Sequence, residues 1–246
     1  MKKALGGILG GWLVLSGWGG MAILSAAAQV DPLKQDIDNA IKDLASEKFM
    51  RSQEARTELV EIGSKAVPAL VASLGDSKTS VQIRHAICEI LARIRDGSKP
   101  AVNALIARLE DHEEYGTSVS SVAVAALAAL GDDSAAPKIT DLLKRSPGPV
   151  DTDKTLKYEC IRALVILRHK PAAEVLRKGL EDKRTTALDD SDDYSHLIAA
   201  ASAEALGKLR AGEAVDDLGK LLKEEIKDKF SDHTLGWHAA KALQRI

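Results

Sequence analysis

The side chains that could bind a metal ion lie in two stretches in the second half of the chain. Asp192, Asp193 and His196 stand in "DDSDDYSH", and His233 stands further along in "SDHT". Carboxylate oxygens and imidazole nitrogens are ligands for Zn²⁺ and similar ions, so these four residues form a metal site if the two stretches meet. We favour a solvated acidic loop without a ligand, because the first stretch lacks the glycine and terminal glutamate of a calcium-binding loop. We therefore assign no metal and no cofactor.

The same part of the sequence also offers residues that could contact a protein partner. Four segments rich in polar and acidic residues separate the more apolar parts of the chain, at 111–120, 146–155, 183–196 and 226–234. Three of these segments contain an aromatic residue, namely Tyr115, Tyr194 and Phe230. Acidic side chains with interleaved aromatic residues suit contact with a basic protein surface, which is the second interpretation of these segments.

Motifs for nucleophilic catalysis are absent from the sequence. There is no G-x-S-x-G turn for a serine nucleophile and no glycine-rich loop that would hold a phosphate group. The two cysteines, Cys88 and Cys160, do not stand in a setting that would activate a thiolate. We therefore expect that the chain is not an enzyme.

The elements that must position these segments are short helices that recur along the chain. Segments such as "HAICEILARI" and "SAEALGKLR" align on one leucine, with spacings of 32 to 42 residues. The aligned leucines are Leu59, Leu91, Leu127, Leu164, Leu206 and Leu243. The residue three positions later is always aliphatic, and the residue four positions earlier is small or apolar, which predicts one apolar face of a helix.

A second helix is expected after five of these six first helices, as in "SKAVPALVASL" and "GEAVDDLGKLL". Four of the second helices have a proline in their opening turn, where backbone N–H groups have no intrahelical partner. The glycines between the helices suit a helix C-terminus; they are Gly63, Gly97, Gly131 and Gly212. A period of two short helices predicts an all-α solenoid (an α-α superhelix) of about five helix pairs.

Both ends of the array have a single helix in this interpretation. An N-terminal cap helix is expected within 29–49, with Asp31 as its cap and Pro32 in its first turn. The repeat domain then spans 50–246 and ends in a single helix, which gives twelve helices. Cys88 and Cys160 lie a whole repeat apart, at roughly two helix diameters, so no disulfide is expected between them.

Basic residues on the second helices predict a further binding surface. We expect the second helices to line the concave face, where Arg108, Lys144 and Arg177 would contact an acidic segment of a protein partner. The alternative is ordinary helix chemistry, because cations are favoured near helix C-termini.

The first 28 residues have the pattern of a secretory signal peptide. Lys2 and Lys3 precede an apolar run from Leu5 to Leu24, and "SAAAQ" supplies a cleavage site after Ala28. The alternative is an uncleaved N-terminal membrane anchor. We expect an exported protein, periplasmic or secreted, without stable membrane insertion after cleavage. Loss of both lysines changes the formal charge from −2 to −4, which does not favour binding to nucleic acid.

The repeat pattern "A-L-x-x-L-G" followed by "A-V-x-x-L-x-x-L" resembles HEAT repeats, specifically the short HEAT-like class found in phycobilisome lyases. The resemblance covers residues 50–246 and implies the solenoid fold. A bilin-lyase role would follow from it by analogy only. We expect instead a scaffold or adaptor that binds a protein partner through its concave face or its inter-repeat loop edge, without catalysis of its own. The alternative is a metal-binding protein or enzyme that uses the acidic and histidine-containing loops.

Overall fold

The computed structural model describes residues 31–111, 119–145, 152–182, 198–225, 227–228 and 233–246. The expected signal peptide, 1–28, lies outside these residues. Within the described residues, no helix is both long and apolar enough to span a bilayer.

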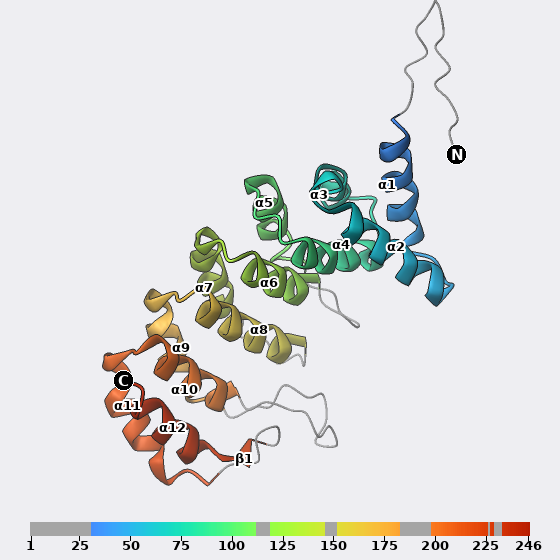
Figure 1. Cartoon of the computed structure of the whole chain (residues 1–246). Coiled ribbons are helices and arrows are strands. Elements are labelled where there is room, and N and C mark those ends of the chain that lie inside the picture. The colour runs from blue at the N-terminus through green and yellow to red at the C-terminus, as the bar shows by residue number, and fades with distance from the viewer. Residues whose placement is uncertain (1–30, 112–118, 146–151, 183–197, 226, 229–232) are drawn as a thin grey trace, which may run out of the picture.

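The described part of the chain contains twelve α-helices, as expected, and they form two rows (Figure 1). One row holds the first helix of each repeat: α2 (Phe49–Ile62), α4 (Val81–Ile94), α6 (Val119–Leu130), α8 (Thr152–Ile166), α10 (Ile198–Leu209) and α12 (Leu235–Leu243). The other row holds α1 (Pro32–Asp43) and the second helices α3 (Val67–Gly75), α5 (Lys99–Ile106), α7 (Ala136–Arg145), α9 (Ala173–Gly179) and α11 (Val215–Lys220). The same described residues also contain one antiparallel ladder, in which β1 (Lys227–Asp228) pairs with β2 (His233–Thr234).

Local sequence signals explain where several helices begin. The Asp31 side chain accepts a hydrogen bond from the backbone N–H of Leu33 at 3.1 Å, and Pro32 occupies the first turn of α1. Thr234 accepts one from the N–H of Trp237 at 3.2 Å and begins α12. These contacts satisfy N–H groups that have no intrahelical partner.

The first helices end in left-handed residues, but not always at the expected glycines. Gly63 and Gly131 have φ angles of 66° and 72°. The expectation for Gly97 and Gly212 was wrong, because the left-handed residue in those two repeats comes earlier, at Arg95 and Arg210. In these repeats the left-handed residue stands four positions after the aligned leucine, whatever its side chain.

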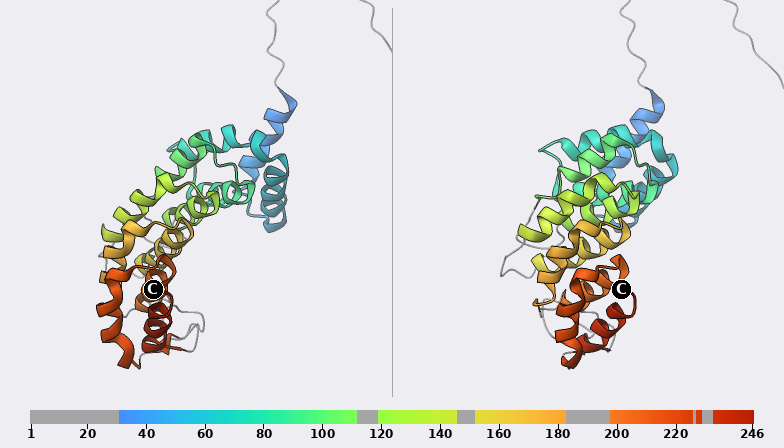
Figure 2. Two further views of the ribbon diagram at one scale, coloured as in Figure 1. Left: turned by 60° about the vertical axis from the view of Figure 1, so that its left-hand side comes forward. Right: turned by 90° about the vertical axis from the view of Figure 1, so that its left-hand side faces the viewer.

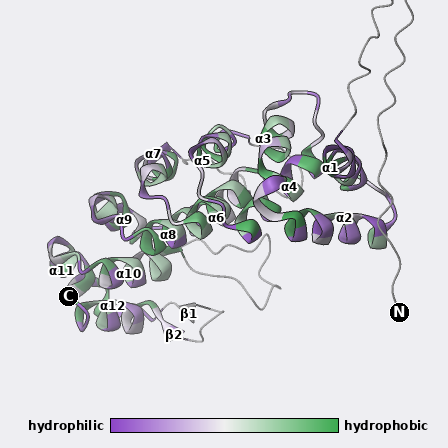
Figure 3. Cartoon of the chain, turned by 45° about the horizontal axis from the view of Figure 1, so that its top comes forward, coloured by the Kyte–Doolittle hydropathy of each residue, from purple (hydrophilic) through white to green (hydrophobic). Residues whose placement is uncertain are grey.

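The six aligned leucines form a continuous spine in the core. Five of them, from Leu59 to Leu206, are at most 1% exposed, whereas Leu243 in the last helix is half-buried. Figure 3 shows hydrophobic residues concentrated where the two rows meet and hydrophilic residues on the outer surfaces. Cys88 and Cys160 are both buried within this core, on α4 and α8, and no disulfide joins them.

The array bends into an arc whose inner side is formed by the first helices, and Figure 2 shows the second helices outside it. The expectation that the second helices line the concave face was therefore wrong. The inner side of an arc is shorter, so neighbouring helices must approach more closely there. Small side chains permit this approach: α6 reads "VSSVAVAALAAL" and α10 reads "IAAASAEALGKL".

Candidate functional site

A pocket of about 690 Å³ lies on the inner face of the arc, between α2, α4, α6 and α8. Its apolar lining includes Ile90 on α4 and Val122, Ala125 and Ala126 on α6. Because α6 carries mainly small residues, its side chains protrude less than those of the neighbouring helices. This leaves room for a ligand or for a side chain of a partner.

Polar residues from α2 and α4 form one wall of this pocket. Arg56 on α2 forms an ion pair with Glu89 on α4, and the Nδ1 atom of His85 lies 3.8 Å from the same carboxylate. The Nε2 atom of His85 and the Nε atom of Arg56 are both shielded from solvent and have no hydrogen-bond partner within the described residues. Buried polar atoms without partners are uncommon in native structures, and both of these residues line the pocket.

Burial lowers the pKa of His85 below its usual value of 6.5. The carboxylate of Glu89 opposes this shift, and the guanidinium of Arg56 adds to it. His85 is therefore neutral at physiological pH, so its imidazole can accept a proton as well as a hydrogen bond.

The pocket also has a free cation on its rim. Arg93 lines the pocket and is exposed, and it forms no ion pair within the described residues. On the opposite wall, Glu159 is held by Arg162 at 2.9 Å. Arg93 is thus the charge most available to a ligand, and it favours one with a carboxylate or another anionic group.

The structure places the basic residues predicted from sequence on the other row. Lys144 on α7 and Arg177 on α9 belong to the outer helices, and Arg108 follows the end of α5. Their acidic neighbours are Asp111, 3.4 Å from Arg108, Asp141, 3.6 Å from Lys144, and Asp217, 2.6 Å from Arg177. Hydrogen bonds from Lys220 and Arg177 lower the pKa of Asp217, as expected for a carboxylate that neutralises a cation. A role for these residues in binding remains a prediction, but they do not form a concave stripe.

Most residues predicted for the loop edge lie outside the described part of the chain: Asp192, Asp193, His196, Tyr115, Tyr194 and Phe230. The remaining metal candidate, His233, lies in β2 and stacks on Trp237 with ring centroids 3.7 Å apart. The described residues contain no group of three or more His, Cys, Asp and Glu residues placed to hold a metal ion. The predicted metal site stays untested.

One signal for the pocket is present in the sequence but did not enter the prediction. His85 and Glu89 are four residues apart, so they lie on the same face of α4. Their partner Arg56 comes from the preceding repeat, 33 residues away from Glu89. The pocket could be found from sequence only by knowing which row faces inward.

Comparisons with known proteins agree with this architecture. The model of HEAT repeats matches residues 67–151, and the phycobilisome (PBS) lyase HEAT-like repeat matches residues 156–182 and 198–224. No curated protein matches the sequence. Among solved structures, the chain is similar to one in the complex of CpcE and CpcF of phycocyanin lyase from Nostoc sp. PCC7120, with 25% identity and a TM-score of 0.55. The match covers 72% of this chain and 63% of that chain, which is less than two thirds of its length.

This similarity corrects the expectation that the chain is not an enzyme. The similar chain belongs to a lyase, so a HEAT-like array without the motifs of serine or phosphate-transferring enzymes can still take part in catalysis. The expectation failed because it rested on the absence of a nucleophile in a turn and of a phosphate loop. The pocket lined by His85, Arg56 and Glu89 is built on adjacent helices, so a search for those two loop motifs could not detect it.

Proposed function

Because this chain is a HEAT-repeat protein whose C-terminal repeats match those of phycobilisome lyases, we propose that it binds a segment of a protein partner in the inner-face pocket. The observation that carries the proposal is the combination of an apolar floor on α6 with polar atoms on α2 and α4 that lack partners within the described residues. Extended inner surfaces of this kind are what solenoid proteins offer to a partner. The similar solved structure is itself a complex of two proteins, which supports the same function.

The partner segment should present an apolar side chain to the floor and a carboxylate to the rim. Ala125 is exposed on the floor and leaves room for an apolar group. Of the two arginines that line the pocket, Arg56 is paired with Glu89, whereas Arg93 forms no ion pair in the described structure and supplies the positive charge. Truncating or reversing such a charge at an interface changes both association rate and specificity.

Site-specific photo-crosslinking in the cells that make the protein tests this proposal. A photoreactive residue at Ala125 should give a discrete protein adduct, whereas one at Lys138 should not, because Lys138 is exposed on the outer helix α7. Arg93→Glu should abolish the adduct at Ala125. Equal adducts at both positions, or an adduct that survives Arg93→Glu, would exclude the inner pocket as the binding site.

A second candidate function is a lyase activity like that of the similar solved complex, and His85 favours it. A neutral imidazole with a free ring nitrogen can exchange a proton with a bound group. The test is incubation of the protein with phycocyanin, monitored by visible absorption. His85→Gln should remove any spectral change that the wild-type protein causes, while His169→Gln, on the turn after α8, should leave it intact. The absence of a change with wild-type protein would leave protein binding as the function supported.

A further inference from the structure

Five successive first helices end at the same register position, four residues after the aligned leucine. The residues at this position are Gly63, Arg95, Gly131, Arg168 and Arg210, with φ angles of 66°, 56°, 72°, 53° and 55°. Glycine adopts this left-handed conformation freely, whereas a residue with a side chain is strained there. Two repeats therefore use the unstrained residue, and three carry an arginine in its place.

We call these three arginines the arginine row. Their side chains have no partner for an ion pair or a hydrogen bond within the described structure. Arg95, Arg168 and Arg210 are exposed, and none forms an ion pair or a side-chain hydrogen bond with the described residues. The cations predicted from sequence to bind a partner, such as Arg177, are by contrast paired with acids. A strained residue whose side chain forms no ion pair or hydrogen bond in the described structure is available for contact with another molecule.

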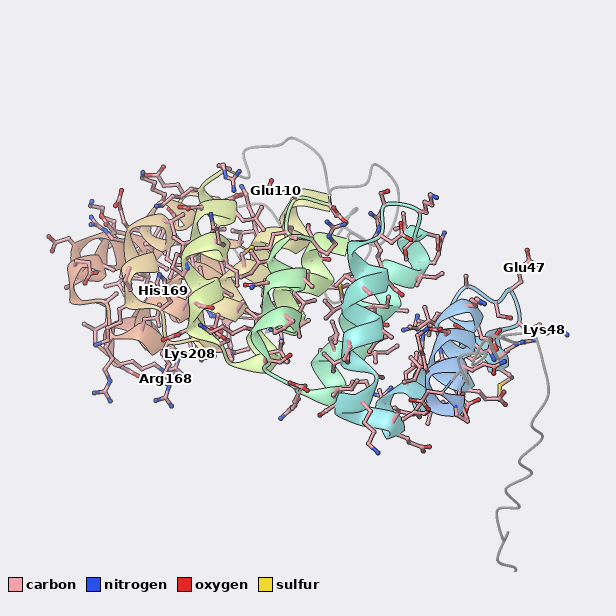
Figure 4. The ribbon with its side chains drawn as sticks, turned by 90° about the horizontal axis from the view of Figure 1, so that it is seen from above. Glu47, Lys48, Glu110, Arg168, His169 and Lys208 are labelled. Carbon is pink, nitrogen blue, oxygen red and sulfur yellow. The ribbon has the colours of Figure 1, made fainter. Side chains whose placement is uncertain are left out.

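All members of the row lie on one edge of the array. The tight turns between the two helices of each repeat form this edge, and the connections between repeats form the opposite one (Figure 1). Figure 4 shows Arg168 and Lys208 on the tight-turn edge and Glu110 on the other side. Lys65 and Lys170 are exposed on the same turns.

The acids on these turns only partly balance the cations. The carboxylates of Asp96 and Asp132 accept hydrogen bonds from the backbone N–H groups of Ser98 and Ser134, at 3.0 and 2.9 Å. Asp133 and Glu213 are the other acidic residues of the turns. The five cations named on these turns exceed the four acids by one, so the tight-turn edge has a small net positive charge, in a protein whose formal charge is −2.

We propose that the tight-turn edge docks on the anionic headgroups of a phospholipid membrane. Neither the inner-face pocket nor the other described pockets are lined by the arginine row. A row of protruding turns encloses no ligand, but it can lie along an extended charged surface. In the alternative of an uncleaved anchor, the apolar N-terminal run from Leu5 to Leu24 would hold the folded chain at such a surface. Docking by this edge leaves the inner pocket open.

Vesicle binding by the full chain tests the proposal, with arginine-to-glycine variants that should preserve the fold. Arg95→Gly, Arg168→Gly and Arg210→Gly each remove a positive charge and introduce glycine, the residue that Gly63 and Gly131 supply at the same position in other repeats. Because glycine adopts a positive φ without strain, the melting temperature should stay the same or rise. The readout is the ratio of partition coefficients between vesicles of equal phosphatidylglycerol and phosphatidylcholine and vesicles of phosphatidylcholine alone. Any contribution of the apolar run cancels in this ratio. Since each basic side chain near an anionic surface contributes about fivefold, the triple variant should lower the ratio roughly a hundredfold, and added salt should lower the wild-type ratio.

Two controls show whether the effect belongs to this edge. Lys42, Lys48 and Lys223 are exposed away from the tight turns, and their joint replacement by Gln removes the same charge, so it should change the ratio little. A fluorophore on Gly212→Cys, beside Arg210, should report a less polar environment with anionic vesicles, whereas one on Lys78→Cys, on the opposite edge, should not. An unchanged ratio in the triple variant, an equal effect of the lysine replacements, or an equal response at position 78 would overturn the proposal. Loss of a crosslinked partner at Ala125 would affect only the proposed function.

Discussion

His85 and Cys88 lie three residues apart on α4, and burial shifts the pKa of each in the direction that favours its uncharged form. The His85 side chain is 17% exposed and lines the inner pocket, while Cys88 is fully buried. Burial disfavours the charged form of either group, so the pKa of the imidazole falls and the pKa of the thiol rises to about 12. One turn of helix thus holds an imidazole that is neutral at physiological pH and a thiol that stays protonated.

The lowered pKa of His85 predicts a loss of stability in acid. Unfolding restores the usual pKa of 6.5, so the unfolded chain binds more protons than the folded chain between the two pKa values. The contribution of His85 to stability is therefore complete above pH 6.5 and falls as the pH drops through this range. Urea unfolding at about pH 8 and about pH 5 should show a smaller decrease for His85→Gln than for the wild-type protein. Equal decreases would mean that the imidazole is not buried.

The raised pKa of Cys88 predicts that its thiol is unreactive in the folded protein. Cys160 is also fully buried, on α8. Because thiolates and not thiols attack disulfide reagents, neither cysteine should react with Ellman's reagent at about pH 8 before unfolding. Both should react after addition of guanidinium chloride. A native cysteine that reacts at the rate of a free thiol would show that its helix is not packed as described.

At the element scale, close approach between helices depends on glycines at specific contacts. Gly207 lies in the last turn of α10, where an added Cβ would stand 2.6 Å from the Cα of Ala242 on α12. Backbone atoms cannot move aside as the end of a flexible side chain can, so the two helices would have to separate. A Cβ added at Gly219 on α11 would meet no heavy atom of another part of the described structure within 4 Å.

These two positions predict opposite effects of one substitution. Gly207→Ala should lower the free energy of unfolding by about 1–3 kcal/mol through overpacking. Gly219→Ala should raise it by about 0.5–1 kcal/mol, because alanine loses less backbone entropy in a helix. Urea unfolding curves of both variants measure the difference. A neutral Gly207→Ala would indicate that α12 is not seated against α10.

The helices themselves could be predicted from sequence because their signals are local. Leu59 and its counterparts recur every 32 to 42 residues, and the buried face follows from the period of a helix. The direction of curvature is not local, since it depends on the side-chain sizes of α6 and α10 relative to the helices beside them. The pocket is still less local, because Arg56 and Glu89 meet only when two repeats stack.

At the scale of the whole molecule, each repeat is stabilised mainly by its neighbours along the chain. One core cluster runs from Ile37 in α1 to Ala242 in α12, and the helices of the described residues that pack most closely belong to the same repeat or to adjacent ones. Stability in such an array is close to a sum of repeat and interface contributions. An interior substitution therefore weakens two interfaces, and a terminal one weakens a single interface.

This arrangement predicts how far the effect of one substitution spreads. Leu127→Ala removes a fully buried side chain in α6, which packs against both α4 and α8. It should lower the free energy of unfolding by about 2–5 kcal/mol and reduce hydrogen-exchange protection in all three helices. Leu243→Ala, in the half-buried last helix, should cost less and reduce protection only in α10, α11 and α12. Hydrogen exchange followed by mass spectrometry separates the two patterns, and a uniform loss along the array in either variant would mean that the repeats unfold as one cooperative unit.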